Sequence, residues 1–218
     1  MRMLDLFCGR FGWGIAFAAR GWEVVGVDLI EPPDIPNGCL LKRQDVMGLW
    51  STNQGWFHGP YGEWPQWNEK FDFICASSPC ENFSLFGMKH FHPNPPYPDL
   101  GIKLFNHTRS LCEASGLPYV MENVRPCQKF VGPAVAHCGS FYLWGNAVPP
   151  LLPAPIKNGL SMYRDPITGK RELRLGRRSS HNSKQRAMDK AITATIPPEL
   201  SGCIADYAMR LVKQRGAA

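Results

Sequence analysis

The sequence predicts an α/β fold built on a doubly wound, mostly parallel sheet. Short apolar runs of strand length alternate with segments that have one apolar helical face. Most of these runs stop at Gly, Pro or an acidic residue, as strands do where they meet a functional loop. Such alternation is typical of βαβ units, whose strands run parallel.

The N-terminal residues supply the first βαβ unit. Residues 3–7 (MLDLF) form a short apolar run that stops before Gly9, which predicts a buried strand ending in a turn. A helix is expected over 12–20, where Ile15 and several alanines offer an apolar face. A second strand is expected over 23–27 (EVVGV), closed by Asp28.

The later elements are more widely spaced. Residues 40–45 end a third expected strand, and the stretch 49–67, rich in Trp, Gly and Pro, is interpreted as a long surface excursion. The other expected strands are 71–76, 117–121, 139–144 and 172–175, the last in a small basic hairpin after the turn 165–169. The other expected helices are 101–115 and 199–213, and the expected Pro-rich loops are 93–98 and 149–155.

Composition narrows the class of protein. A chain of 218 residues with 44% hydrophobic content suits one soluble domain, with room for a small appendage. No apolar run approaches the roughly 18 residues of a membrane span, and the N-terminus does not resemble a secretory signal. We therefore expect a cytoplasmic protein that does not associate with membranes. The 8 cysteines form no CxxC pair, so we expect neither a metal site nor a disulfide framework.

The positive charge is concentrated near the C-terminus. Residues 164–190 hold nine Lys or Arg and three Asp or Glu, which accounts for the whole net charge of +6. A concentrated basic segment suits a polyanion such as nucleic acid. A solvated basic loop is the alternative.

The turn after the first expected strand favours a nucleoside-type cofactor. Glycines at a strand end let the backbone approach a ligand closely. Asp28, at the end of the next strand, is placed to accept hydrogen bonds from a ribose diol. The spacing departs from a dinucleotide GxGxxG, and a purely structural turn remains the alternative.

Two further strand exits carry reactive groups. Ser77-Ser78-Pro79-Cys80 follows the fourth expected strand, where Pro79 would aim the Cys80 thiol outward. Glu122 follows the fifth, and an acid ending a buried strand is costly unless it acts there. A thiol and a carboxyl in one crevice suggest nucleophilic attack with proton delivery.

In this order, DLFCGRFGWG, a Pro-Cys followed by Phe-Ser, and ENV resemble the first, fourth and sixth motifs of the cytosine-5 DNA methyltransferases. The resemblance covers about the first 125 residues. It implies a Rossmann-like S-adenosylmethionine-dependent methyltransferase fold with a small basic C-terminal appendage. It also implies methyl transfer from S-adenosylmethionine to C5 of cytosine in double-stranded DNA, with the target base flipped out.

The resemblance assigns roles to residues. Cys80 would add to C6 of cytosine, and Glu122 would bind or protonate N3. Asp28 would bind the cofactor's ribose, and Asp45 its adenine amino group. The other implied cofactor residues are Asp5, Phe7, Cys8, Gly9, Gly12, Ser77 and Pro79. The implied nucleic-acid contacts are Asn82, Ser84, Arg174, Arg177 and Arg178.

The sequence departs from the family pattern in two ways, and one further motif has two candidate positions. No Gln-x-Arg-x-Arg follows ENV, so one of the later arginines would have to replace it. The family's closing motif matches 145–150 literally and 194–198 approximately. We favour 194–198, because Pro153 and Pro155 would break a helix after 145–150. The recognition region is short, which suits a small restriction–modification or phage-type member.

The predicted organisation is a catalytic and cofactor-binding core over 1–146, a basic recognition segment over 147–191, and a C-terminal helix over 192–218 that returns to the core. The leading interpretation is therefore a DNA cytosine-5 methyltransferase in a bacterial or phage-infected cell. The same chemistry on tRNA and a catalytically inactive DNA-binding relative are the alternatives.

Overall fold

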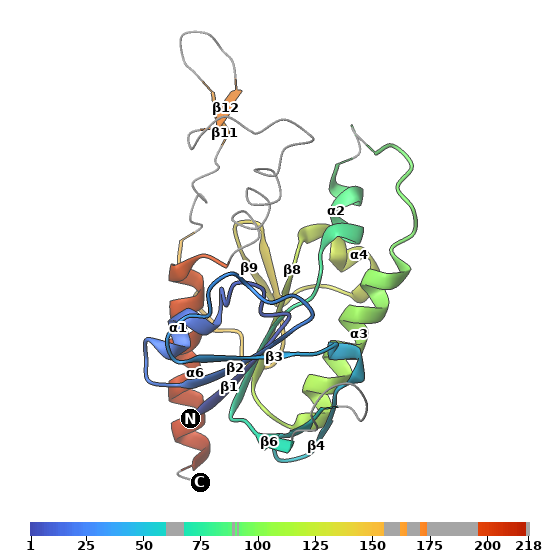
Figure 1. The fold of residues 1–218 in the computed structure, drawn as a ribbon. Coiled ribbons are helices and arrows are strands. Elements are labelled where there is room, and N and C mark those ends of the chain that lie inside the picture. The colour runs from blue at the N-terminus through green and yellow to red at the C-terminus, as the bar shows by residue number, and fades with distance from the viewer. Residues whose placement is uncertain are drawn as a thin grey trace.

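A seven-stranded sheet forms the centre of the molecule in the computed structural model (Figure 1). The structure describes residues 1–59, 68–88, 90, 92–154 and 196–216, together with the backbone of 162–164 and 171–173. The strands of this sheet are β1 (Arg2–Leu6), β2 (Glu23–Asp28), β3 (Cys39–Arg43), β7 (Phe73–Ser77), β8 (Tyr119–Asn123), β9 (Ala136–Cys138) and β10 (Phe141–Trp144). Their order across the sheet is β3-β2-β1-β7-β8-β10-β9.

The sheet is mostly parallel, as predicted. The pairs β1–β2, β2–β3, β1–β7 and β7–β8 are all parallel, whereas β10 pairs antiparallel with both β8 and β9. Counted along the chain, the strand order is 3-2-1-4-5-7-6, with one reversed strand. This doubly wound, Rossmann-like arrangement confirms the fold class that the sequence predicts.

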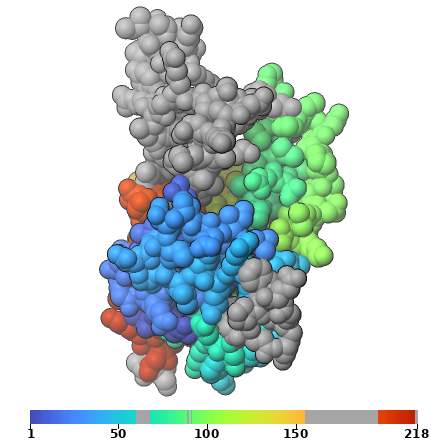
Figure 2. All heavy atoms as spheres, viewed as in Figure 1, coloured from blue at the N-terminus to red at the C-terminus, as the bar shows by residue number. Residues whose placement is uncertain are grey.

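Helices cover both faces of the sheet. On one face, α1 (Gly14–Ala18) contacts the long C-terminal helix α6 (Pro198–Gly216), and Figures 1 and 2 show the red α6 beside the blue N-terminal residues. On the other face lie α2 (Glu81–Gly87), α3 (Asp99–Ser115), α4 (Gln128–Val131) and the 3-10 turns η1 (Val46–Gly48) and η2 (Arg125–Cys127).

Alternation along the strands creates two separate hydrophobic cores. Met3 and Val24 point into the core that holds Ile204 of α6, whereas Leu4 and Val25 point into the core that holds Phe105 of α3. The period of two in each strand therefore divides the apolar residues between the faces.

The described part of the Trp-rich stretch after β3, residues 49–59, is more ordered than the sequence suggested, and residues 60–67 of the predicted excursion lie outside the described residues. Its strands β4 (Trp50–Thr52) and β5 (Trp56–His58) form a small antiparallel sheet with β6 (Asn68–Lys70). Phe57 is fully buried, and the Ser51 hydroxyl donates a hydrogen bond to the Leu111 carbonyl of α3. Packing of these two side chains against the main body fixes strands too short to show a periodic pattern.

Several predicted element boundaries are wrong by two residues or more. The first helix is shorter than 12–20, because the chain continues as a turn as far as Trp13. Strand β8 occupies 119–123 rather than 117–121, so Glu122 lies inside the strand. The 139–144 strand is one arm of a hairpin, β9–β10, which turns at Gly139 with a left-handed φ of 61°.

The predicted basic hairpin has two antiparallel strands, β11 (Met162–Arg164) and β12 (Arg171–Leu173). Its second strand precedes the predicted 172–175 by one residue at the start. Within the part of the chain that the structure describes, no helix is long and apolar enough to cross a bilayer. The same residues contain no group of three side chains suited to a metal ion.

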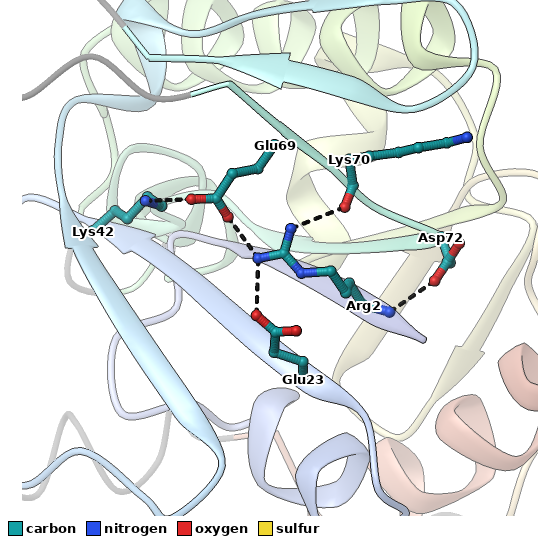
Figure 3. Close-up of polar contacts among 6 residues, drawn as sticks. All are labelled: Arg2, Glu23, Lys42, Glu69, Lys70 and Asp72. Carbon is teal, nitrogen blue, oxygen red and sulfur yellow. Dashed lines mark hydrogen bonds and ion pairs between the residues drawn. The ribbon is translucent and has the colours of Figure 1, made fainter.

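A charged network ties the strands together at the start of β1 (Figure 3). The Arg2 guanidinium lies 2.9 Å from Glu23 and 2.7 Å from Glu69, and Lys42 lies 2.7 Å from the second Glu69 oxygen. The Arg2 backbone N–H donates to Asp72 at 2.8 Å. The network thus joins strands β1, β2, β3 and β6 around the start of β1, the end of that strand opposite the turn that follows it.

We predict that Glu69→Gln lowers the free energy of unfolding by about 1 kcal/mol at neutral pH, because it weakens two partly buried ion pairs. Burial alone would raise the pKa of the Glu69 carboxyl, but hydrogen bonds from Lys42 and Arg2 lower it. The ion pairs of Glu69 therefore contribute stability above the pKa that Glu69 has in the unfolded chain. That contribution is lost as the pH falls through the lower pKa of Glu69 in the folded protein. Urea unfolding at pH 7 and pH 3 measures the difference, with exposed Glu31→Gln as the control. An equal loss at both pH values would contradict the electrostatic account.

Candidate active site

The chain folds back sharply after β1. Phe7, Gly9 and Phe11 all adopt left-handed φ angles, of 57°, 49° and 58°. Such angles are strained for phenylalanine, so surrounding contacts must hold them. The Asp5 carboxylate supplies one such contact by accepting a hydrogen bond from the Gly14 N–H at 3.1 Å. The three left-handed residues and the hydrogen bond to Asp5 thus shape a compact turn at the carboxyl end of β1.

Asp5 and Cys8, both predicted to line a cofactor, have buried side chains. Asp5 is fully buried, and its Oδ1 has no hydrogen-bond partner among the described residues. Burial raises the pKa of Asp5 to about 8. The Cys8 thiol would lie 2.7 Å from a Cβ added at Gly26, so it packs beneath the turn against β2. In this conformation, the side chains of Asp5 and Cys8 pack under the turn and stabilise its backbone.

Asp28, at the end of β2, faces the same turn. Its Oδ2 accepts a hydrogen bond from the Gly9 N–H at 2.9 Å, and its Oδ1 accepts one from the Ile30 N–H at 3.0 Å. Each carboxylate oxygen can accept a further bond, so the half-buried Asp28 keeps capacity for a ligand diol. Leu29 and Ile30 beside it are 55% and 75% exposed and offer apolar surface that the sequence analysis did not single out.

The other predicted cofactor residues surround this turn at different depths. Phe7 is half-buried, and a Cβ added at Gly9 would meet no atom of the described residues within 4 Å, so among these residues the turn is open above Gly9. Asp45 is exposed and accepts a hydrogen bond from the Met47 N–H at 2.9 Å at the start of η1. The carboxylate of Asp45 is therefore accessible but already caps a short helix.

The C-terminal part of the chain returns to this turn. A Cβ added at Gly12 would lie 3.0 Å from the backbone nitrogen of Ile196, just before α6 begins. In contrast, Asn146 follows β10 and pairs with the amino end of β8, where its Oδ1 accepts from the Tyr119 N–H at 2.8 Å. Of the two segments that resemble the family's closing motif, the second is described only over Ile196–Pro198, and Ile196 lies against this turn.

Cys80 lies at the start of α2, just beyond β7. Its carbonyl accepts hydrogen bonds from the Ser84 N–H at 2.9 Å and the Ser84 hydroxyl at 3.0 Å, which fix the first turn of the helix. The preceding Pro79 is exposed, and Cys80 itself is half-buried. Burial raises the pKa of the Cys80 thiol, the Ser84 hydrogen bond lowers it, and the charges of Glu122 and Glu81 raise it further.

Glu122 lies beside Cys80 from the neighbouring strand. It pairs in register with Ser77 at the end of β7 and is 9% exposed. Burial raises the pKa of Glu122 to about 7, and a hydrogen bond from the Ser77 hydroxyl opposes the rise. A carboxyl of this kind still holds its proton near neutral pH and can deliver it to a bound substrate.

Asn123 fixes the connection between the segments that carry Cys80 and Glu122. Its side-chain amide donates to the Ser78 carbonyl at 3.0 Å and to the Ser78 hydroxyl at 3.1 Å. Its own Oδ1 accepts from the Val124 N–H at 2.9 Å. The segment that carries Cys80 is therefore tied to the end of β8 by a fully buried side chain.

One polar link was not anticipated from the sequence. The indole N–H of Trp13 donates to the Ser77 hydroxyl at 2.9 Å and so joins the turn after β1 to the end of β7. Ser77 was predicted as a cofactor residue, but its hydroxyl is engaged by Trp13 and Glu122.

The predicted nucleic-acid residues divide into two groups. Ser84 stabilises the backbone of Cys80, and the half-buried Asn82 packs against the start of α3. Arg174, Arg177 and Arg178 lie outside the described residues. The roles of all five in binding nucleic acid remain predictions.

No protein-family model matches the chain, and no curated protein matches it. Among solved structures, the glycopeptide N-methyltransferase MtfA complexed with (S)-adenosyl-L-methionine is similar to it at 16% identity. That match covers 56% of this chain and 47% of MtfA, with a TM-score of 0.28. A second structure of MtfA matches at 17% identity over 56% of this chain and 46% of that one, with a TM-score of 0.29. The chain thus aligns with less than half the length of MtfA.

We predict that the Cys80 thiol of the free protein is alkylated slowly at neutral pH and that the rate rises with a midpoint above that of an ordinary thiol. Glu122→Gln should move this midpoint to lower pH, because Glu122 is anionic in the range where the thiol ionises. Iodoacetamide labelling, with mass spectrometry of the peptide that contains Cys80, measures the rate.

Glu113→Gln is the control for that experiment, because Glu113 lies near the end of α3 and does not perturb Cys80. A midpoint at or below that of an ordinary thiol in the unmodified protein would contradict the burial of Cys80 described above.

Proposed function

We propose that this protein is an S-adenosylmethionine-dependent methyltransferase that methylates C5 of cytosine in DNA. The observation that carries the proposal is the meeting of Cys80 and Glu122 at the carboxyl ends of two adjacent parallel strands. Glu122 is close enough for its charge to raise the pKa of Cys80, and Ser77 links Glu122 to the turn after β1. A nucleophile, a proton donor and a glycine turn thus share one edge of the sheet.

The residues around the turn fit a nucleoside-type methyl donor. Asp28 retains acceptor capacity for a ribose diol, the space above Gly9 is open, and Ile30 offers apolar surface to an aromatic base. When bound, the cofactor would supply an electrophilic methyl group on a sulfonium centre. The similarity to MtfA is too limited to support this assignment, which rests on the residues of this chain.

Cys80 and Glu122 would have different roles in the reaction with the cytosine ring. The Cys80 thiolate adds to C6 of cytosine while Glu122 delivers its proton to N3, so that negative charge does not accumulate on the ring. C5 would then bond to the methyl group as the bond between that group and the cofactor sulfur breaks. Loss of the C5 proton to a base, elimination of the Cys80 thiolate and return of the N3 proton to Glu122 leave 5-methylcytosine. Glu122, with a pKa of about 7, carries the required proton near neutral pH.

DNA is the substrate that the sequence favours. The basic residues of 164–190 suit phosphate contacts, which position a protein on nucleic acid without reading sequence. Addition to C6 requires access to the face of the ring, so a cytosine in a duplex would have to leave the base stack.

We predict that Cys80→Ser abolishes methyl transfer, because a serine hydroxyl is far less ionised than a thiol near neutral pH. The unmodified protein should form a covalent adduct with DNA that contains 5-fluorocytosine, since fluorine cannot leave C5 as a proton does. Denaturing gel electrophoresis detects the adduct. Cys203→Ser, at a half-buried cysteine of α6, serves as the matched control and should still form it. Adduct formation by Cys80→Ser would assign the nucleophile to another residue.

We predict that Glu122→Gln slows the single-turnover rate of methyl transfer by about a hundred-fold or more, the usual contribution of a positioned acid. Affinity for DNA should change little, because the interaction strengthens as charge develops on the ring. Rapid-quench kinetics and a binding titration separate the two effects. Weaker DNA binding at an unchanged single-turnover rate would contradict the proton-donor role.

A further inference from the structure

A short chain of hydrogen bonds joins the turn after β1 to Glu122. Trp13 immediately precedes α1 and is 1% exposed, and its indole N–H donates to the Ser77 hydroxyl at 2.9 Å. Ser77 lies opposite Glu122 in the β7–β8 register, and the two side chains are hydrogen-bonded. Three elements far apart in sequence are thus connected through side chains alone.

The chemistry of the three groups gives this chain a direction. An indole N–H can only donate, and a serine hydroxyl has one proton to give. Because Trp13 occupies a lone pair of the Ser77 oxygen, the hydroxyl proton is available to the Glu122 carboxylate. Without the indole donor, the Ser77 hydroxyl could still donate to the Glu122 carboxylate, but nothing would orient it toward that carboxylate.

We propose that Trp13 and Ser77 are positioning residues that hold the Glu122 carboxyl in place for proton delivery and couple it to the turn after β1. We call this chain from Trp13 through Ser77 to Glu122 the relay. Its role in catalysis rests on the proposed function. Its effect on the pKa of Glu122 does not, because the ionisation of Glu122 can be measured without any substrate.

Few other groups can set the ionisation of Glu122. The titratable side chains that respond to its charge are Cys80 at the start of α2 and Cys127 in η2, both of which remain neutral thiols near neutral pH because burial raises their pKa. Burial raises the pKa of Glu122, and the bond from Ser77 is the interaction that lowers it. The relay is therefore the main polar influence on this carboxyl from the described residues.

The test is a titration of Glu122 by NMR in protein labelled at the glutamate side-chain carbon, with Glu122→Gln to assign the signal. The unmodified protein should titrate near pH 7. Ser77→Ala should raise the midpoint by about one pH unit, since it removes a hydrogen bond to the charged form. Trp13→Phe should shift it in the same direction by less. The double variant should shift no further than Ser77→Ala alone.

Trp22→Phe is the matched control. Trp22 is 2% exposed in the same hydrophobic core as Trp13, and its indole N–H has no hydrogen-bond partner among the described residues. This variant removes the same atom from the same core without touching Ser77, so the midpoint should stay where it is. An equal shift in Trp22→Phe and Trp13→Phe, or no shift in Ser77→Ala, would overturn the relay.

Kinetics provide a second, independent readout. A proton donor is active when protonated, so once Cys80 is ionised in the assembled complex the single-turnover rate of methyl transfer should fall as the pH rises through the Glu122 midpoint. Ser77→Ala should move that fall to higher pH, and Ser77→Thr, which keeps the hydroxyl, should restore it. A protein whose Glu122 midpoint responds as described but which transfers no methyl group would retain the relay and refute the proposed function. A protein that transfers the methyl group but whose Glu122 midpoint does not change in Ser77→Ala would retain the proposed function and refute the relay.

Discussion

Parallel pairing of β1 with β7, and of β7 with β8, is the constraint on which the site depends. Parallel neighbours end at the same edge of a sheet, so whatever follows each strand is brought together. The register places Ser77 opposite Glu122 and Asp5 opposite Cys75. The turn after β1, the thiol after β7 and the carboxyl of β8 therefore meet without any local sequence signal that joins them.

Burial at this edge of the sheet shifts the pKa values of Asp5, Cys80 and Glu122. It raises the pKa of Glu122 to about 7 and that of Asp5 to about 8, so both carboxyls hold protons more strongly than exposed ones do. It also raises the pKa of the Cys80 thiol, and none of the described groups that perturb Cys80 is a cation. In the proposed mechanism the free protein would thus hold the proton donor ready and keep the nucleophile neutral, which leaves ionisation of Cys80 to the assembled complex.

The sequence predicted the fold and the adjacency of Cys80 and Glu122 because both follow from local patterns. Apolar runs ending in Gly, Pro or an acid marked the strands, and Cys80 and Glu122 stood at two of their ends. The end of β8 was misplaced because Glu122 is polar, and a polar residue normally closes a buried run. The three-residue strands around Phe57 were too short to reveal a period. The bond between Trp13 and Ser77 spans 64 positions, so only the folded chain reveals it.

The most direct test of the account is transfer of a labelled methyl group from S-adenosylmethionine to duplex DNA and, in parallel, to tRNA. Digestion to nucleosides then identifies the modified base. The account predicts label in 5-methyldeoxycytidine, absent with Cys80→Ser. Label in 5-methylcytidine from tRNA alone would preserve the chemistry and reject DNA as the substrate. Label on an exocyclic nitrogen, or retained transfer in Cys80→Ser, would contradict the central claim that Cys80 and Glu122 act together on the cytosine ring.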